Sequence, residues 1–375
     1  MVSEKSCRIL VTGAHGFIGK NLVIRLLELP DIVVDEYIRS DHPDTLLERV
    51  NQADAIVHLA GENRPNDNSA FMNVNARLTE ILCSAIRAGT RPIPIIFASS
   101  IQAELDNAYG RSKRIAEIAI QKLAMEMSSP ATIFRLPGVF GKWSRPNYNS
   151  VVATFCYNIA RGLPIRIDND TTSIDLVYID DVVDRMLTIL LRGQHSGFEY
   201  MEIKPKYTVT LGDLVGQIEA FKSCRSTLMI ERVGIGLARA LYATYISYLP
   251  NTNFAYEIPQ YVDSRGRFVE FLKTPDSGQF SYFIAHPGVT RGGHYHHTKT
   301  EKFLVIKGLA QFRFRHLITD ELFELTTCGD KPQVVDTIPG WAHDISNIGD
   351  VDLVVMLWAG EIFDRDLTDT VARKV

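Results

Sequence analysis

Three histidines and a glutamate with the spacing of metal ligands lie in the last third of the chain. His294 and His296 are two residues apart, so on a β-strand their side chains share a face, whereas His297 points to the other face. Glu301 follows five residues after His296, and His343 lies in a later strand-like segment. A lone His-x-His pair is most often solvated. The four residues His294, His296, Glu301 and His343 together form a borderline-soft set, which predicts a site for zinc or for iron(II), manganese or nickel.

A second group of residues near the N-terminus could bind phosphate. Gly13, Gly16 and Gly19 stand in the segment TGAHGFIG, after an apolar strand-like run and at the start of a helix-like one. Glycines let the backbone approach a pyrophosphate closely, and a helix N-terminus contributes roughly half a positive charge. The alternative is a strand-to-helix turn whose glycines serve packing alone. The position after the first strand of an alternating pattern favours a dinucleotide site.

A tyrosine, a lysine and a serine could exchange a proton with a substrate oxygen. Tyr109 and Lys113 are four residues apart in a helix-like segment and therefore share a face. A free tyrosine has a pKa of about 10, and a neighbouring ammonium brings that pKa closer to neutrality. Ser100, at the end of an apolar run, could hydrogen-bond the same oxygen. A Tyr-x3-Lys pair alone usually marks a solvated helix face, but with the serine and the glycine-rich turn it predicts an acid–base site.

The elements that must position these residues follow two patterns. Between residue 7 and about residue 135, short apolar runs alternate with helical stretches, which predicts a doubly wound parallel sheet. Residues 150–250 are more irregular and end in a segment rich in Tyr, Asn and Pro, at 240–259, that marks a boundary. After it, short alternating strands predict an all-β barrel or sandwich. We therefore expect two domains, residues 1–250 and residues 251–375.

Six short motifs of the N-terminal part occur in a fixed order over about residues 8–185. They are TGAHGFIG, DAIVHLAG, NVN, FASS, YGRSK and VYIDDVVD. With them the chain resembles the extended short-chain dehydrogenase/reductase family. The resemblance implies a Rossmann fold, a tightly held nicotinamide cofactor and a nucleotide-sugar substrate. It also implies that Tyr109 is the general acid/base, that Lys113 modulates its pKa and anchors the ribose, and that Ser100 hydrogen-bonds the carbonyl. The implied cofactor contacts are Gly13, His15, Gly16, Phe17, Ile18, Gly19, Leu59, Ala60, Tyr109 and Lys113.

The choice between NAD and NADP depends on the end of the second strand. NAD enzymes usually place an acidic residue there, on the ribose 2′-hydroxyl. In the run IVVDEYIRS, Asp35 and Glu36 lie midway, and Arg39 and Ser40 end the expected strand. A guanidinium suits a 2′-phosphate, so Arg39 and Ser40 predict NADPH. The alternative is a surface arginine on a loop.

The two residues after Ser100 bear on the reaction. Dehydratases of the family carry Asp-Glu there, because loss of water needs an additional acid and base. Ile101 and Gln102 occupy these positions. Their side chains favour plain ketone reduction, or a 4-epimerase, over dehydration.

The histidine set lies within two motifs similar to those of cupins. The first is matched by Gly288, His294, His296, Glu301 and Gly308, and the second by Gly340, His343 and Asn347. The resemblance implies a C-terminal cupin barrel that binds the metal. The segments DSRGRFVEF and GVTRGGHYH further resemble the nucleotide-linked 4-keto-sugar 3,5-epimerases, usually metal-free cupins with a histidine base at the position of His294.

The two parts together predict consecutive reactions. A C4 ketone makes the C3 hydrogen of a sugar acidic, and a metal can stabilise the charge that develops on deprotonation. Reduction of the ketone removes this acidity, so epimerisation must come first. Segments from both domains, including SSIQAELDNAYGRSK and HYHHTKTEKFLVIKG, are similar to bifunctional capsule and O-antigen enzymes of the N-acetyl-L-fucosamine precursor pathway. That resemblance implies C3 epimerisation of a UDP-4-keto-sugar, reduction with NADPH to UDP-2-acetamido-2,6-dideoxy-L-talose, zinc, and a homodimer or higher homo-oligomer.

Two other functions stay open at this point. One is an NAD-dependent nucleotide-sugar 4-epimerase whose cupin only mediates assembly or binds sugar. A tightly retained NAD that is not consumed would favour it. The other is a non-catalytic sugar-binding or regulatory protein, against which the set of Ser100, Tyr109 and Lys113 argues.

Composition narrows the partners. The 375 residues carry a formal net charge of −4 and no evident basic patch, which argues against nucleic acid. The apolar runs are of strand length, far short of a membrane span, and no signal-peptide pattern precedes the first strand. The five cysteines have neither metal nor redox spacing, so we expect reduced thiols in a cytoplasmic protein.

Overall fold

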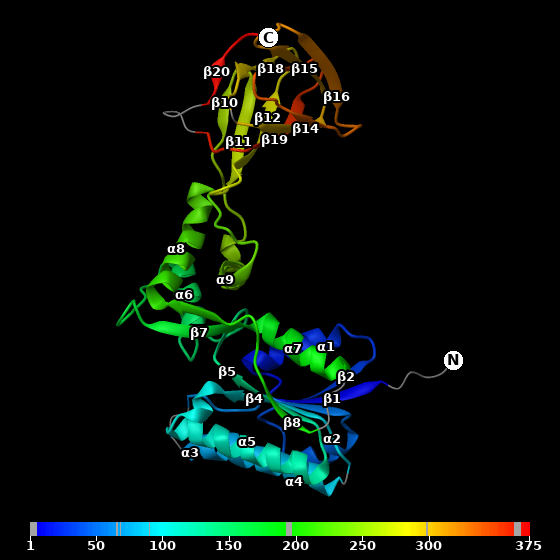
Figure 1. Ribbon diagram of the computed structural model, residues 1–375, viewed down its shortest axis with the longest axis vertical. Helices are drawn as coiled ribbons and strands as arrows, with labels where there is room; N and C mark the ends of the chain where they lie inside the picture. The colour runs from blue at the N-terminus through cyan, green and yellow to red at the C-terminus, as the bar shows by residue number, and fades with distance from the viewer. Residues whose placement is uncertain are drawn as a thin grey trace, which may run out of the picture. The chain divides into compact units, whose positions relative to one another are not determined.

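The computed structural model describes residues 6–64, 67, 69–89, 91–192, 197–297, 299–363 and 369–375. The chain divides into two compact units (Figure 1). The first comprises Met1–Ile218 with Ala240–Leu249, and the second comprises Glu219–Arg239 with Pro250–Val375. The boundary at residue 250 between two functional domains stays a prediction, because compactness assigns no activity to either unit.

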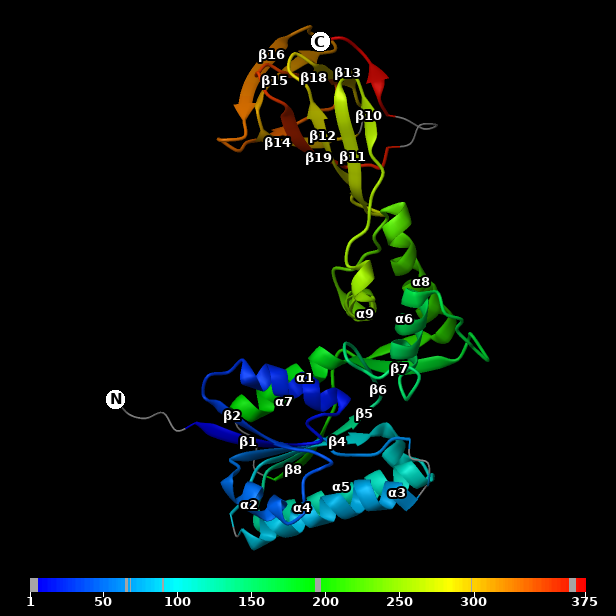
Figure 2. The same ribbon diagram turned by 180° about the vertical axis from the view of Figure 1, so that it is seen from behind.

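A six-stranded parallel sheet forms the centre of the first unit. Its spatial order is β2 (Ile32–Tyr37), β1 (Cys7–Thr12), β3 (Ala55–His58), β4 (Ile95–Ser100), β5 (Ala131–Leu136) and β8 (Phe198–Met201). Helices α1 (Phe17–Leu27) and α7 (Ile179–Arg192) cover one face (Figures 1 and 2). Helices α2 (Thr45–Gln52), α4 (Leu78–Ala88) and α5 (Ala108–Met127) cover the other. The predicted doubly wound, Rossmann-like sheet is confirmed.

Burial on both faces of this sheet explains why its strands are continuous apolar runs in the sequence. Leu10, Ile56 and Ile95, on three neighbouring strands, are fully buried in one cluster. Leu82 of α4 and Ile120 of α5 pack into the same cluster. Helices on both sides leave no solvated face, so alternation of apolar and polar residues is absent.

The second strand ends earlier than the sequence pattern predicts. β2 stops at Tyr37, so the placement of Arg39 and Ser40 at the strand end was wrong. The Asp41 carboxylate accepts the backbone N–H of Ile38 at 2.9 Å, which draws the chain into a turn. Arg39 and Ser40 therefore lie on an exposed loop after the strand.

The remainder of the first unit contains a small sheet and several helices. The sheet has the order β6 (Gly138–Phe140), β7 (Ser173–Tyr178) and β9 (Tyr207–Thr210). Helices α6 (Val151–Arg161) and α9 (Gly236–Ser247) belong to the same part of the chain, whereas the short α3 (Ser69–Phe71) lies beside α5. Helix α8 (Leu211–Thr227) has residues in both units. The boundary segment at 240–259 begins inside α9, where Ala240, Leu241 and Tyr245 are buried at helical spacing.

From residue 261 on, the second unit contains two antiparallel sheets. One has the order β10 (Tyr261–Asp263), β11 (Gly266–Lys273), β12 (Gln279–Ala285), β19 (Leu353–Ala359), β14 (Glu301–Lys307) and β17 (Val334–Asp336). The other has the order β16 (Leu322–Cys328), β15 (Leu309–His316), β18 (Trp341–Asn347), β13 (Thr290–Tyr295) and β20 (Val371–Ala372). Phe283, Phe303, Phe312 and Leu353 belong to its apolar core. The all-β character predicted for the C-terminal part is confirmed.

Two further features concern the length of the helices and the state of the cysteines. Within the described ranges, no helix is long and apolar enough to cross a membrane. All five cysteines are free thiols, and three of them are buried.

Candidate active sites

The turn between β1 and α1 packs so closely on neighbouring backbone that two of its positions require glycine. Gly13 has a φ of +72°, and a Cβ atom there would lie 2.6 Å from the backbone nitrogen of Ala60. A Cβ on Gly19 would lie 2.3 Å from the carbonyl oxygen of Gly13. Helix α1 starts after Gly16, which provides no side-chain cap, so its first N–H groups suit an anion.

The loops after β2 and β3 meet through a carboxylate that sequence patterns did not indicate. Arg39 donates from Nη2 to Oε2 of Glu62 at 2.8 Å, and the Tyr148 hydroxyl donates to Oε1 of Glu62 at the same distance. The Arg39 side chain is 82% exposed, whereas that of Glu62 is 14% exposed. Arg39 therefore lies at the carboxyl ends of the strands, and its positive charge is paired with the carboxylate of Glu62. Glu62 lies two residues after the predicted contact Ala60.

His15, another predicted cofactor contact, also has an acidic neighbour. Its Nε2 lies 3.2 Å from Oε2 of Glu36, and both side chains are exposed. Asp35 instead receives a hydrogen bond from Arg49 at 2.5 Å. Of the two acidic residues of β2, Glu36 is the one directed toward the glycine-rich turn.

The serine, tyrosine and lysine meet at the carboxyl end of β4. Ser100 is the last residue of β4, and its Oγ accepts the N–H of Gln102 at 3.2 Å. Tyr109 lies in the first turn of α5, which Asn107 caps by accepting the N–H of Gly110 at 2.7 Å. Burial raises the pKa of Tyr109, and a hydrogen bond with Ser100 opposes that rise. The structure thus brings together the hydroxyl groups that the sequence paired.

Contacts with β4, the strand that ends in Ser100, hold the ammonium group of Lys113 in place. Its Nζ donates to the carbonyl oxygen of Ala98 at 2.7 Å and lies 4.4 Å from the centre of the Phe97 ring. Burial lowers the pKa of Lys113 to about 8, and the charge of Glu117 opposes this shift. A lysine with this pKa is still mostly charged at neutral pH, as an electrostatic partner for a tyrosinate must be.

Two buried side chains support the set, and sequence spacing had not singled them out. Asn75 lies on a π-helical turn (Met72–Arg77); it accepts the N–H of Glu62 at 2.8 Å and donates to Oγ of Ser112 at 3.0 Å. Glu117 receives a bidentate hydrogen bond from Arg135 of β5. The signal for Glu117 was available, since it lies one helical turn after Lys113. For Asn75, the sequence offered one signal, its place in the NVN motif.

The rate of a reaction in which Tyr109 exchanges a proton should depend on the charge of Lys113. The charged form is present below a pH of about 8 and lost above it, so kcat/KM should fall about tenfold per pH unit on the alkaline side. A pH profile of kcat/KM measures this limb. In Lys113→Arg the guanidinium stays charged, so the alkaline fall in kcat/KM should move to a pH above the measured range. An unchanged limb in that variant would assign the ionisation to another group.

The predicted metal ligands converge in the second unit. His294 lies on β13, His296 one residue beyond it, Glu301 at the start of β14, and His343 on β18. One ligand atom from each lies within 4.8 Å of all the others. Oε2 of Glu301 is 3.3 Å from Nε2 of His296 and 3.4 Å from Nε2 of His343. The spacing argument for His294 and His296 and the placement of His343 on a later strand are consistent with this geometry.

The polar atoms of this cluster fit a metal ion. Both ring nitrogens of His343 are buried and lack a hydrogen-bond partner among the described residues, which is costly unless another group binds them. Burial alone would raise the pKa of Glu301, but the adjacent imidazoles of His296 and His343 and the ammonium of Lys299 hold it well below its usual range. Burial lowers the pKa of His294 to about 4. Neutral imidazoles and an ionised carboxylate are the forms that bind metals.

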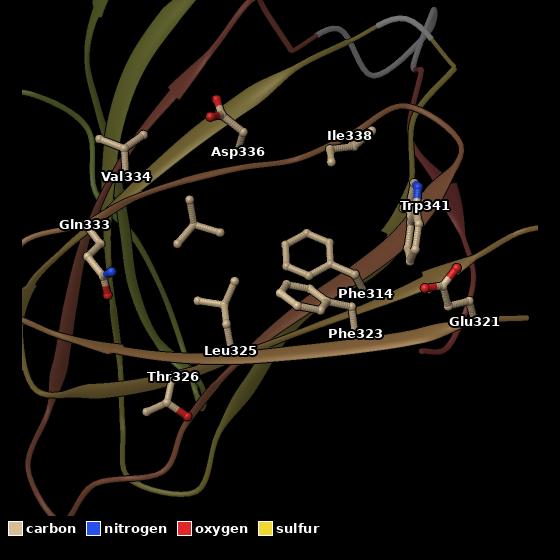
Figure 3. A pocket seen from close by; sticks show the side chains of 11 residues that line it. Phe314, Glu321, Phe323, Leu325, Thr326, Gln333, Val334, Asp336, Ile338 and Trp341 are labelled. Atoms are coloured by element: carbon tan, nitrogen blue, oxygen red, sulfur yellow. The ribbon is translucent and has the colours of Figure 1, made fainter.

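A cavity of about 500 Å³ opens beside the cluster. Figure 3 shows the rings of Phe314, Phe323 and Trp341 along its wall, with Glu321 and Asp336 also lining it. The ring centroids of Phe314 and His343 are 6.3 Å apart, so one wall of the cavity packs on a predicted ligand. Aromatic walls with carboxylates suit an uncharged ring with hydroxyl groups better than a pyrophosphate.

The parallel sheet, the glycine-rich turn and the Ser–Tyr–Lys set define a nucleotide-binding dehydrogenase or epimerase fold. The family model described as NAD dependent epimerase/dehydratase family matches residues 9–200, and the chain belongs to this family. A second model, described as Polysaccharide biosynthesis C-terminal domain, matches residues 261–371.

Two relatives cover both units. The chain is 52% identical over 368 residues to a Pseudomonas aeruginosa protein named UDP-2-acetamido-2,6-beta-L-arabino-hexul-4-ose reductase, covering 98% of this chain and 99% of that protein. It is 40% identical to the crystal structure of the capsular polysaccharide assembling protein CapF from Staphylococcus aureus, with a TM-score of 0.90 and coverage of 98% and 100%. A UDP-glucuronic acid 4-epimerase from Bacillus cereus, in complex with NAD, is 18% identical with a TM-score of 0.55; it covers 64% of this chain and shares the fold alone.

Proposed function

We propose that the chain is a bifunctional nucleotide-sugar enzyme of capsule or O-antigen synthesis. Residues 1–250 reduce the C4 ketone of a UDP-2-acetamido-2,6-dideoxy-4-ketohexose with NADPH, after residues 251–375, a cupin, have inverted C3. The product is UDP-2-acetamido-2,6-dideoxy-L-talose. The observation that carries the proposal is the presence, in one chain, of the Ser100–Tyr109–Lys113 set and the histidine–glutamate cluster. The named reductase activity of the Pseudomonas relative, at 52% identity over nearly the whole chain, supports it.

In the reductase part, the side chains handle the proton and the charge. When bound, NADPH supplies the hydride that C4 receives. The Tyr109 hydroxyl donates its proton to the C4 oxygen, to which the Ser100 hydroxyl also donates a hydrogen bond. Lys113 stabilises the tyrosinate that remains, since its ammonium lies one helical turn from Tyr109.

In the epimerase part, His294, His296, Glu301 and His343 would hold zinc. Bound zinc supplies positive charge where the C4 carbonyl develops negative charge as C3 loses its proton. The unpartnered nitrogens of His343 and the ionised Glu301 support this assignment. The aromatic cavity beside Phe314 has room for the sugar ring.

The contact between Arg39 and Glu62 sets an expectation for cofactor choice. If Arg39 binds the 2′-phosphate, Arg39→Ala removes a charge-assisted hydrogen bond and should raise KM for NADPH about 10–100-fold, with little change for NADH. Glu62→Gln should act in the opposite direction, because it removes a negative charge next to that phosphate. We expect KM for NADPH to fall about threefold to tenfold in this variant. Equal effects on NADH and NADPH would show that Arg39 does not meet a 2′-phosphate.

A second candidate is an NAD-dependent nucleotide-sugar 4-epimerase. Two acidic side chains close to predicted cofactor contacts favour it, Glu36 beside His15 and Glu62 beside Arg39. The deciding experiment incubates the protein with a UDP-4-keto-6-deoxy-N-acetylhexosamine and NADPH and identifies the product by NMR. Stoichiometric NADPH oxidation with inversion at C3 supports the bifunctional enzyme. Retained NAD with no net oxidation supports the 4-epimerase. A homo-oligomer and a cytoplasmic location remain part of the proposal.

A further inference from the structure

The end of the chain returns to the strand that carries His294. β20 pairs antiparallel with β13, with His294 opposite Ala372 and Tyr295 opposite Val371. The N–H of Arg373 donates to the carbonyl oxygen of Gly293 at 2.8 Å. Residues 371–373 therefore form the edge of the sheet next to a predicted metal ligand (Figure 1).

Asp369, two residues before β20, binds the backbone of two residues that lie in sequence between two other predicted ligands. Its carboxylate accepts the backbone N–H of His297 at 2.9 Å through Oδ1 and that of Lys299 at 2.8 Å through Oδ2. These two residues lie between His296 and Glu301. A carboxylate that accepts two backbone N–H groups of one turn restricts the path of that turn.

The main chain of Asp369 also acts on His296 directly. Its carbonyl oxygen is hydrogen-bonded to Nδ1 of His296, and a carbonyl can only accept, so Nδ1 carries the proton. The lone pair of His296 is then on Nε2, the atom 3.3 Å from Oε2 of Glu301. A hydrogen bond from one ring nitrogen to a carbonyl is the usual way in which a ligating imidazole is oriented and its tautomer selected.

From these contacts we infer that the C-terminal segment 369–375 positions the metal ligands of the second unit. Asp369 makes both contacts: its carboxylate binds the backbone N–H groups of His297 and Lys299, and its carbonyl leaves Nε2 of His296 free to bind the metal. This inference rests on the proposed metal site. It adds that the affinity of the site for the metal depends on residues that are distant in sequence from all four ligands.

The test measures metal affinity, using Zn²⁺ in competition with a chromogenic chelator and the visible absorption of Co²⁺-loaded protein. Asp369→Ala should weaken Zn²⁺ binding about 10–100-fold and change the Co²⁺ spectrum. Asp369→Asn keeps one acceptor oxygen, so its affinity should lie between those of the unmodified protein and Asp369→Ala. Asp352→Ala is the control, because Asp352 is a half-exposed aspartate of the same unit that pairs with His286.

The outcomes separate this inference from the proposed function. If the unmodified protein binds neither Zn²⁺ nor Co²⁺, the metal site itself is wrong. If it binds them and Asp369→Ala binds equally well with the same spectrum, the positioning role is wrong. Thermal unfolding of the metal-free variants is the second measurement. A weakened affinity that Asp369→Asn does not partly restore, together with unfolding of the metal-free Asp369→Ala protein, also overturns the positioning role, because a general fold defect then accounts for it.

Discussion

Replacing Tyr109 by phenylalanine is expected to lower NADPH-dependent ketone reduction about 10²–10⁴-fold, the usual contribution of a positioned acid or base. The change removes only the hydroxyl that we propose donates a proton to the C4 oxygen. The ring can keep its contact with Phe71, whose centroid lies 5.5 Å away. Exchange of the C3 hydrogen with solvent should continue, because its predicted groups lie in the second unit. The two measurements are NADPH oxidation and deuterium incorporation at C3.

A matched control separates this effect from loss of a tyrosine hydroxyl in general. Tyr157→Phe makes the same change on α6, where the ring keeps its stacking with the Arg161 guanidinium at 3.8 Å. This variant should reduce the ketone at the rate of the unmodified protein. NADPH oxidation that survives in Tyr109→Phe at the unmodified rate would remove Tyr109 from the proposed mechanism.

The parts of the structure that could be predicted from the sequence are those with periodic patterns. The parallel sheet follows from continuous apolar runs, because strands covered on both faces show no alternation. The proximity of Tyr109 and Lys113 follows from the four-residue helical spacing. His294 and His296 share a face because strand residues alternate. In each case a local rule sets the direction of the side chain.

The contacts that could not be predicted join loops that are distant in the chain. Glu62 meets Arg39 and Tyr148, and Asp369 meets the turn after His296, with no periodic pattern in any of the segments involved. The end of β2 was misplaced for a related reason. The apolar Ile38 extends the strand pattern, but the side chain of Asp41 accepts the N–H of Ile38 and closes a turn directly after Tyr37.

Removal of one metal ligand is the second change with a large expected effect. In His343→Ala, the second unit should no longer retain a divalent ion during gel filtration, and C3 exchange should be lost with it. Neither buried nitrogen of His343 forms a hydrogen bond among the described residues, and Nε2 lies 3.4 Å from Oε2 of Glu301, which is itself a predicted ligand. The polar contacts of this imidazole therefore belong to the cluster. Reduction of the unepimerised ketone by the first unit should persist, since Tyr109 and Lys113 are untouched.

The same variant distinguishes a chemical role of the metal from a structural one. If the ion serves the fold, its binding free energy is folding free energy, and the unfolding transition of the second unit should fall to that of the chelator-treated unmodified protein. If it serves the reaction alone, C3 exchange should vanish while this transition stays in place. His286→Ala is the control, because His286 is a half-exposed histidine of the same unit that pairs with Asp352. Full metal content together with full C3 exchange in His343→Ala would exclude both roles, because neither a structural nor a catalytic ligand can be lost without altering one of the two.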